Sequence, residues 1–195
     1  MPPQDCWDAT EDIHDNADYP HVFRYYVARG FIEPGDRVLD ASCGYGYGTR
    51  ILARSTAASV LGVDKGDYQI ELATKRGSKY RAPEYLASYQ PAPMDFKQLD
   101  LDTIVELPQC DYLVSIETIE HLESDTRAIE IFKRAAKRMF LSVPIGKTTH
   151  SNQWHKHDYL IRDEFIKLVV DDEWKLFHSA THGGGVHEMF YFVRR

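Results

Sequence analysis

Cysteine is scarce in this sequence. The chain of 195 residues has three, Cys6, Cys43 and Cys110, and no two of them stand in CxxC spacing. An odd number without paired spacing argues against a disulfide framework and against a cysteine zinc site. A reducing compartment suits such a chain best.

Long apolar runs are also missing. No segment approaches the roughly 18 consecutive apolar residues of a membrane span, and residues 1–8 are acidic and carry no apolar secretory signal. We therefore expect a soluble, cytoplasmic protein with no membrane association.

Basic charge is in deficit as well. The sequence has 23 Lys and Arg against 30 Asp and Glu, a formal net charge of −7. Affinity for nucleic acid comes largely from Lys and Arg that neutralise phosphates, so nucleic acid is the less favoured partner, although a local basic patch is compatible with this total. There are no repeats, which argues against a solenoid. Residues 1–18, rich in acids and proline, are predicted to be a mobile arm, and residues 19–195 a single domain.

Short apolar runs alternate with helical patterns along most of the chain. This alternation, closed by a hairpin, predicts an α/β fold: a doubly wound, Rossmann-like sheet of seven strands, mostly parallel, with an antiparallel strand in the C-terminal hairpin. The predicted strands are 37–40, 59–64, 95–100, 111–117, 140–144, 174–179 and 189–194, and the predicted helices are 19–30, 49–54, 68–80, 126–139 and 162–170.

A glycine-rich loop follows the first predicted strand. The strand ends in Asp40, and Gly44, Gly46 and Gly48 follow at alternate positions before helical periodicity resumes at Thr49. Glycines remove side chains where backbone must pass close to a ligand. A strand, glycine loop and helix in this order predict a cofactor-binding loop.

The next strands also end in acids. Asp64 ends the second predicted strand and Asp100 the third. Parallel strands place their C-terminal ends at one edge of the sheet, so these carboxylates are expected at the same edge as Asp40. Each acid alone would more simply be a turn or helix-capping residue, but their repetition favours a binding site.

The residues from 19 to 195 resemble the class I S-adenosylmethionine-dependent methyltransferases. The match is carried by Asp40-Ala-Ser-Cys-Gly-Tyr-Gly46, by Asp64 in the place of the acid that holds the ribose hydroxyls, and by Asp100, followed by Leu101, near the adenine ring. The resemblance implies a transferase with S-adenosyl-L-methionine as cofactor. The implied cofactor-binding residues are Asp40, Ser42, Gly44, Tyr45, Gly46, Asp64, Lys65, Asp100, Leu101 and Glu117.

A nicotinamide dinucleotide enzyme is the competing interpretation. Its fingerprint, G-x-G-x-x-G, would need a third glycine where Thr49 stands. Asp40 directly before the loop would also repel a pyrophosphate, whereas a cofactor that carries a sulfonium and an amino group tolerates the acid.

A second informative stretch, Ser115–Leu122, begins at the end of the fourth predicted strand. If a helix starts at once, Glu117, Glu120 and His121 share one face. The stretch resembles a motif of small-molecule methyltransferases, which implies a small polar acceptor methylated at a hydroxyl oxygen. His121 is the candidate general base, with Glu117 and His157 beside it. The alternative is that His121 caps the helix and the two glutamates are solvated.

His155 and His157 follow the fifth predicted strand. Either could bind the acceptor, have a structural role, or join other side chains in holding a divalent metal. The set Glu117, Glu120, His121 and His157 resembles the metal site of small-RNA 3′-terminal 2′-O-methyltransferases, and Mg²⁺, Mn²⁺ or Zn²⁺ would suit these ligands. Two further alternatives are therefore a metal-dependent RNA or nucleotide 2′-O-methyltransferase and a catalytically silent cofactor-binding partner subunit.

Overall fold

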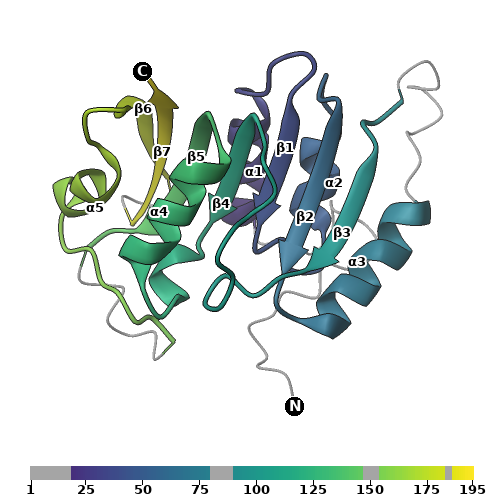
Figure 1. Ribbon diagram of the computed structural model, residues 1–195, viewed down its shortest axis with the longest axis horizontal. Helices are drawn as coiled ribbons and strands as arrows, with labels where there is room; N and C mark the ends of the chain where they lie inside the picture. The colour runs from purple at the N-terminus through teal and green to yellow at the C-terminus, as the bar shows by residue number, and fades with distance from the viewer. Residues whose placement is uncertain (1–18, 80–89, 147–153, 183–185) are drawn as a thin grey trace. The chain divides into compact units, whose positions relative to one another are not determined.

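The structure is a computed structural model that describes residues 19–79, 90–146, 154–182 and 186–195 (Figure 1). The predicted mobile arm, residues 1–18, lies outside the described residues. The chain divides into two compact units, residues 1–99 and 100–195, which are described separately.

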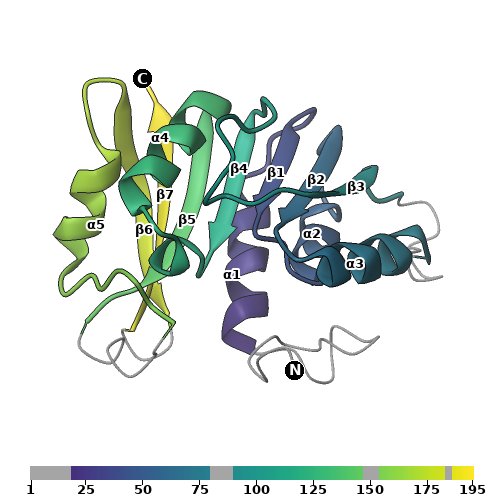
Figure 2. The ribbon, with the colours of Figure 1, turned by 60° about the horizontal axis from the view of Figure 1, so that its bottom comes forward.

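Among its described residues, the first unit has three parallel strands in the order β3-β2-β1 and three helices (Figures 1 and 2). Asp40 of β1 is paired with Gly62 of β2. The elements are α1 (Tyr19–Arg29), β1 (Arg37–Ala41), α2 (Tyr47–Leu52), β2 (Ser59–Asp64), α3 (Asp67–Lys79) and β3 (Met94–Gln98).

Three glycines of the first unit pack closely against the ring of Phe96 on β3. A Cβ atom added at Gly46, Gly62 or Gly77 would lie 2.7, 2.8 or 2.7 Å from this ring. These glycines belong to the loop after β1, to β2 and to α3. The absence of three side chains therefore lets a loop, a strand and a helix close around one aromatic ring.

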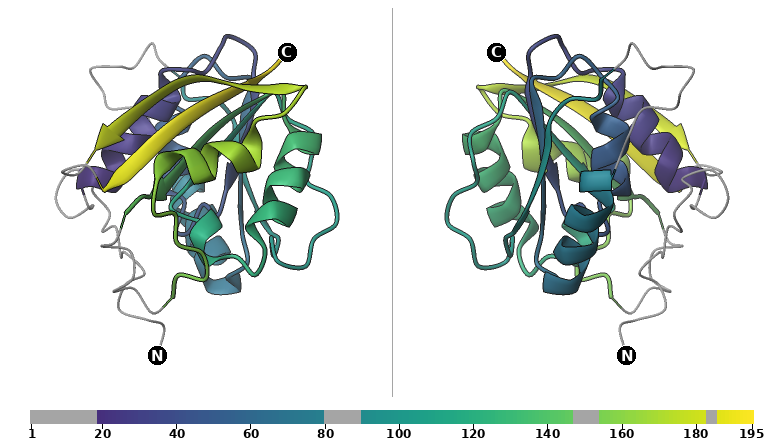
Figure 3. Two further views of the ribbon diagram at one scale, coloured as in Figure 1. Left: turned by 90° about the vertical axis from the view of Figure 1, so that its left-hand side faces the viewer. Right: turned by 90° about the vertical axis from the view of Figure 1, so that its right-hand side faces the viewer.

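The second unit contains four strands in the order β4-β5-β7-β6. Strands β4 and β5 are parallel, and β7 is antiparallel to both β5 and β6. Helices α4 and α5 lie beside each other (Figures 1 and 3), and the buried core includes Phe132, Phe140, Phe165 and Phe190. The elements are β4 (Tyr112–Ile116), the 3-10 turn η2 (Ile119–His121), α4 (Asp125–Ala135), β5 (Arg138–Pro144), α5 (Arg162–Val169), β6 (Trp174–His182) and β7 (His187–Arg194).

The predicted fold class is confirmed: the chain is α/β, with seven mostly parallel strands and an antiparallel strand in the C-terminal hairpin. Several predicted boundaries differ from those of the structure, and the largest error is at the end of one helix. The helix predicted over 126–139 ends at Ala135, because Ala136 is extended and residues from Arg138 onward pair with β4. Among the described residues, no helix combines the length and the apolar character needed to cross a bilayer.

Candidate functional site

The loop after β1, residues 42–46, bends through left-handed backbone. The φ angles of Ser42, Gly44 and Gly46 are 68°, 52° and 75°. Ser42 is the unusual member, because a side chain raises the energy of this conformation. Gly46 donates its backbone N–H to the carbonyl of Cys43 at 2.9 Å, which closes the turn. Strained backbone of this kind is common where a ligand is held.

Asp40, the last residue but one of β1, is fully buried. Its carboxyl oxygens accept hydrogen bonds from the Tyr25 hydroxyl at 3.1 Å and from the Thr49 hydroxyl at 2.6 Å. Burial raises the pKa of Asp40 to about 7, although the two hydroxyl donors act in the opposite direction. Asp40 thus links α1, β1 and α2 from the inside of the unit.

Neither partner of Asp40 was assigned from the sequence. Tyr25 could pass for an ordinary apolar-face residue of the first helix, yet its ring covers Gly48, where a Cβ would lie 2.1 Å away. Thr49 stands where a dinucleotide fingerprint would have glycine, and that substitution is the one signal that could have pointed to it. Burial raises the pKa of the Tyr25 hydroxyl well above its ordinary value, so Tyr25 stays a donor.

Asp64, at the end of β2, holds the loop from the other side. One carboxylate oxygen accepts from the backbone N–H of Gly44 at 2.9 Å and the other from that of Gly66 at 3.0 Å. The side chain is partly exposed, and each oxygen keeps a second lone pair for an outside donor such as a ribose hydroxyl. Gly44 has no heavy atom within 4 Å of the place where a Cβ would be, so its backbone is open on that side. Open loop backbone beside a partly exposed carboxylate fits the nucleoside cofactor expected here.

The remaining predicted cofactor residues of the first unit surround this loop. The buried ring of Tyr45 meets the Tyr68 ring edge-on at 6.4 Å, and Lys65 is exposed directly after β2. The carbonyl of Lys65 accepts a hydrogen bond from the Gln98 side chain at 3.0 Å.

Asp100 and Leu101 open the second unit, two residues after β3 ends. The carbonyl of Asp100 accepts from the N–H groups of Thr103 and Ile104, which forms a tight turn. Arg127 of α4 donates to the carbonyl of Leu101 at 2.8 Å and to that of Ile104. The turn that carries both predicted adenine-binding residues is therefore anchored by a charged side chain.

Glu117 follows β4 and has a φ of 49°, a left-handed conformation that is costly for glutamate. Its Oε1 accepts from the Ser142 hydroxyl at 2.8 Å, and its Oε2 lies 2.7 Å from Nδ1 of His187. The carboxylate is almost buried and the imidazole is 30% exposed. Sequence reasoning gave His187 no role. The register of β7 against β5, which pairs His187 with Pro144 at the end of β5, brings it to Glu117.

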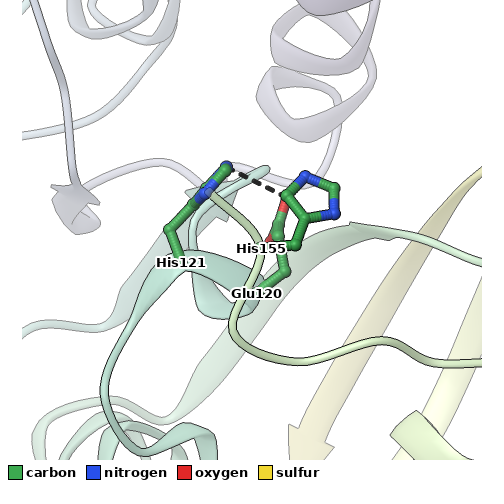
Figure 4. A group of neighbouring side chains, drawn as sticks. All are labelled: Glu120, His121 and His155. Atoms are coloured by element: carbon green, nitrogen blue, oxygen red, sulfur yellow. Dashed lines mark ion pairs between the residues drawn. The ribbon is translucent and has the colours of Figure 1, made fainter. Parts of the chain in front are cut away.

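Glu120, His121 and His155, here called the imidazole cluster, come together (Figure 4). Their ligand-type atoms all lie within 4.8 Å of one another, and Glu120 is only 1% exposed. Nε2 of His121 is 3.8 Å from Glu120 Oε1, while its Nδ1 is 3.1 Å from the carbonyl oxygen of Trp154. Burial, together with the nearby His121, lowers the pKa of His155, which favours a neutral ring with a lone pair.

The grouping differs in part from the predicted metal set. Nε2 of His157 lies 2.9 Å from the carbonyl oxygen of Leu122, and its Nδ1 is 3.6 Å from Asp125. Among the described residues, His155 therefore joins Glu120 and His121, whereas Glu117 is bonded to Ser142 and His187. The carbonyl of Glu120 accepts from the N–H groups of both Lys156 and His157, which fixes this arrangement.

The shared helix face expected for Glu117, Glu120 and His121 does not form. A single 3-10 turn covers Ile119–His121, and Leu122 is already extended. The left-handed Glu117 stands outside that turn and points to β5 and β7. A continuous helix would have needed Glu117 itself in helical backbone.

Comparison with known proteins places this chain in a family. A family model described as a methyltransferase domain matches residues 39–139. One curated relative, the sterol 24-C-methyltransferase ERG6 of Saccharomyces cerevisiae, is 41% identical over 76 residues, which cover 39% of this chain and 18% of that protein. Another, from Debaryomyces hansenii, is 30% identical over 117 residues. The matches span less than a third of these relatives' length.

Solved structures share the fold at low sequence identity. A chain from the complex between the Haloferax volcanii Trm112 methyltransferase activator and a methyltransferase gives a TM-score of 0.69 at 15% identity over 89% of both chains. Magnesium protoporphyrin IX methyltransferase from Synechocystis, with bound S-adenosylmethionine, gives 0.63 at 21% over 89% of this chain and 76% of its own. Small RNA methyltransferase HEN1 gives 0.67 at 19% over 89% and 25%. The family match establishes that the chain belongs to the methyltransferase-domain family, and the solved structures show that it shares the fold of class I S-adenosylmethionine-dependent methyltransferases.

Proposed function

We propose that the enzyme methylates a hydroxyl oxygen of a small polar acceptor. When bound, S-adenosylmethionine supplies an electrophilic methyl group and leaves as a neutral thioether. The chain must then take a proton from the acceptor hydroxyl, because a neutral hydroxyl is a weak nucleophile. The observation that carries the proposal is the concentration of imidazoles and carboxylates in the second unit, around Glu117, His121 and His155.

The proposed cofactor contacts use hydrogen-bond acceptors that the loop leaves available. Asp64 would accept the ribose hydroxyls with the lone pairs that Gly44 and Gly66 leave open. Asp100 would accept from the adenine amino group, on the turn that Arg127 fixes. The other proposed contacts are Asp40, Ser42, Gly44, Tyr45, Gly46, Lys65, Leu101 and Glu117.

His121 is the base that the sequence suggests, and its surroundings support that role. A carbonyl oxygen can only accept, so Nδ1 facing Trp154 carries the proton and Nε2 keeps the lone pair. Glu120 at 3.8 Å would stabilise the imidazolium that forms. The ring is 38% exposed, which leaves room for an approaching hydroxyl. His157 and Glu117 complete the proposed acceptor side.

The test begins with cofactor binding, measured by calorimetry with S-adenosylhomocysteine. A wild-type protein that does not bind it would sink the proposed function. Radiolabelled methyl transfer to a panel containing catechol, 4-nitrophenol, glucose and glycerol then examines the acceptor class. His121→Asn should lower turnover by about 10²-fold or more and leave cofactor affinity unchanged. The matched control is His178→Asn, which alters an exposed imidazole on β6 and should have no effect.

A second candidate function is metal-dependent methylation of a ribose hydroxyl at the end of an RNA or nucleotide. It is favoured by the imidazole cluster, whose carboxylate and two imidazoles are ligands that Mn²⁺ or Zn²⁺ accept. The likeness in fold to small RNA methyltransferase HEN1 also supports it. The net charge of −7 counts against a long RNA contact.

Calorimetry with MnCl₂ or ZnCl₂ tests this candidate without needing the acceptor. Wild type should bind one ion, and His155→Asn should weaken binding at least tenfold. Methyl transfer that persists in EDTA would count against metal dependence. A third possibility, a catalytically silent cofactor-binding subunit, is supported only if cofactor binds and no acceptor is methylated.

A further inference from the structure

The Glu117–His187 pair joins two strands that are distant in sequence. Glu117 follows β4 and His187 begins β7, 70 residues later, yet Oε2 and Nδ1 are 2.7 Å apart. Ser142 of β5 donates to the other carboxylate oxygen at 2.8 Å, and its carbonyl accepts the backbone N–H of Glu117 at 3.0 Å. Two hydrogen bonds to Ser142 therefore fix Glu117, in addition to its contact with the imidazole of His187.

This contact determines which nitrogen of His187 carries the proton. An ionised carboxylate only accepts hydrogen bonds, so Nδ1 of His187 is the donor. In the neutral ring, Nε2 is then the unprotonated nitrogen with an available lone pair. In the described part of the chain, no residue is hydrogen-bonded to Nε2 of His187, and the imidazole is 30% exposed.

The same contact would stabilise the ring once it is protonated. A nearly buried carboxylate at hydrogen-bond distance interacts strongly with an imidazolium, because water screens it little. Glu117 reaches this position only in a left-handed conformation, at a φ of 49°. Such backbone is retained where the surrounding structure enforces it, often at sites of function.

His121 is engaged differently. Its Nε2 faces Glu120, and its ring meets the edge of the His155 ring at a centroid distance of 4.8 Å. The lone pair that a base needs is therefore directed into the imidazole cluster. The equivalent nitrogen of His187 has no such neighbour within hydrogen-bond distance among the described residues.

We infer that His187 is a catalytic residue that accepts the proton of the acceptor, and that Glu117 is its positioning residue. The inference rests on the proposed methylation of a hydroxyl oxygen, and within it assigns the acceptor's proton to His187 instead of His121. The acceptor O–H bond breaks and its proton goes to Nε2 of His187. The acceptor oxygen forms a bond to the methyl carbon as the sulfur–methyl bond breaks, and sulfur keeps that electron pair. The proton then passes from the imidazolium to solvent.

The tautomer can be measured without any acceptor. Long-range ¹H–¹⁵N correlation spectra of the wild-type enzyme should show His187 with a protonated Nδ1 and an unprotonated Nε2 near neutral pH. His187→Asn identifies the signals. In Glu117→Gln the preference for this tautomer should be lost or reduced, an effect that a purely structural role for Glu117 would not require. A wild-type His187 with its proton on Nε2 would overturn the inference.

The kinetic test compares three variants with the radiolabelled assay. His187→Asn keeps a donor for Glu117 but has no basic nitrogen, so turnover should fall about 10²- to 10⁴-fold. Glu117→Gln should lose about tenfold, because a charge-assisted hydrogen bond becomes a neutral one. The matched control is His182→Asn, the residue opposite His187 on β6, which should keep the wild-type rate.

Turnover of His187→Asn at the wild-type rate would contradict the inference. Failure of S-adenosylhomocysteine to bind the wild type would instead contradict the proposed function.

Discussion

The two units differ in how far apart in sequence the hydrogen-bond partners of their acidic side chains lie. In the first unit, both Asp40 and Asp64 are held by hydroxyl or backbone donors from residues close in sequence, between Tyr25 and Gly66. In the second unit, Glu117 depends on His187, which is 70 residues away. The proposed binding loop can thus be built from residues close in sequence, whereas the proposed acid–base pair of Glu117 and His187 is brought together by strand pairing. Substitutions in the two units should accordingly have different effects on stability and on cofactor affinity.

The largest expected effect concerns the buried acid of the first unit. The folded-state pKa of Asp40 is raised from 3.8 to about 7, so its ionisation opposes folding. The stability that its neutral form permits is complete below pH 3.8 and is lost as the pH rises through about 7. Asp40→Asn removes this dependence and should gain stability relative to wild type over that interval. Three pKa units correspond to about 4 kcal/mol.

Urea unfolding of the cofactor-free protein between pH 4.5 and 7.5 measures this difference. Glu33→Gln, a change outside the loop, serves as the control for the general pH response of the chain. A stability difference between wild type and Asp40→Asn that does not change with pH would show that ionisation of Asp40 does not oppose folding.

A somewhat smaller effect is expected from crowding around Phe96. Gly46→Ala would put a methyl group 2.7 Å from that ring and 2.8 Å from the Cβ of Ala73, at a φ of 75°. Overpacking and left-handed backbone together should cost about 3 kcal/mol. Gly35→Ala is the matched control, because Gly35 has a φ of 87° and nothing within 4 Å. It should cost about 1 kcal/mol. Equal melting temperatures for the two variants would mean that packing against Phe96 is unimportant.

The smallest expected effect concerns the turn at the start of the second unit, which Arg127 anchors. Arg127→Met would leave the carbonyls of Leu101 and Ile104 without their guanidinium donor, at a cost of about 2 kcal/mol. If Asp100 and Leu101 contact adenine as proposed, affinity for S-adenosylhomocysteine should also fall several-fold in calorimetry. Arg134→Met, a change farther along α4, is the control. An unchanged affinity in Arg127→Met would argue that this turn does not contribute to the cofactor site.

Local patterns in the sequence predicted the first unit well. Strand β2 has the predicted bounds, Ser59–Asp64, because an apolar run ends there in an acid and a turn. The loop glycines and Asp64 indeed lie together. Tyr25 was not found as a partner of Asp40, because one aromatic residue on a helix is indistinguishable in sequence from ordinary packing.

The second unit was harder to predict from the sequence, for a physical reason. His187 reaches Glu117 only through the antiparallel pairing of β7 with β5, and no local pattern encodes that register. Glu117 in left-handed backbone is likewise a tertiary outcome, because the intrinsic preference of glutamate opposes it. The helix predicted through residue 139 failed because residues 138–139 gain more from pairing with β4 than from another helical turn.

The strand order of the second unit bears on how the enzyme is made. Strand β7 follows β6 in sequence but lies between β5 and β6 in the sheet. A ribosome adds about 5–20 residues per second, so Glu117 is made roughly 4–14 s before its partner His187. Strand β6 is made only late in that interval and has no neighbour to pair with until β7 follows, while the loop after β1 has already been made. A nascent chain should therefore complete the proposed cofactor loop before it acquires the proposed acid–base pair of Glu117 and His187.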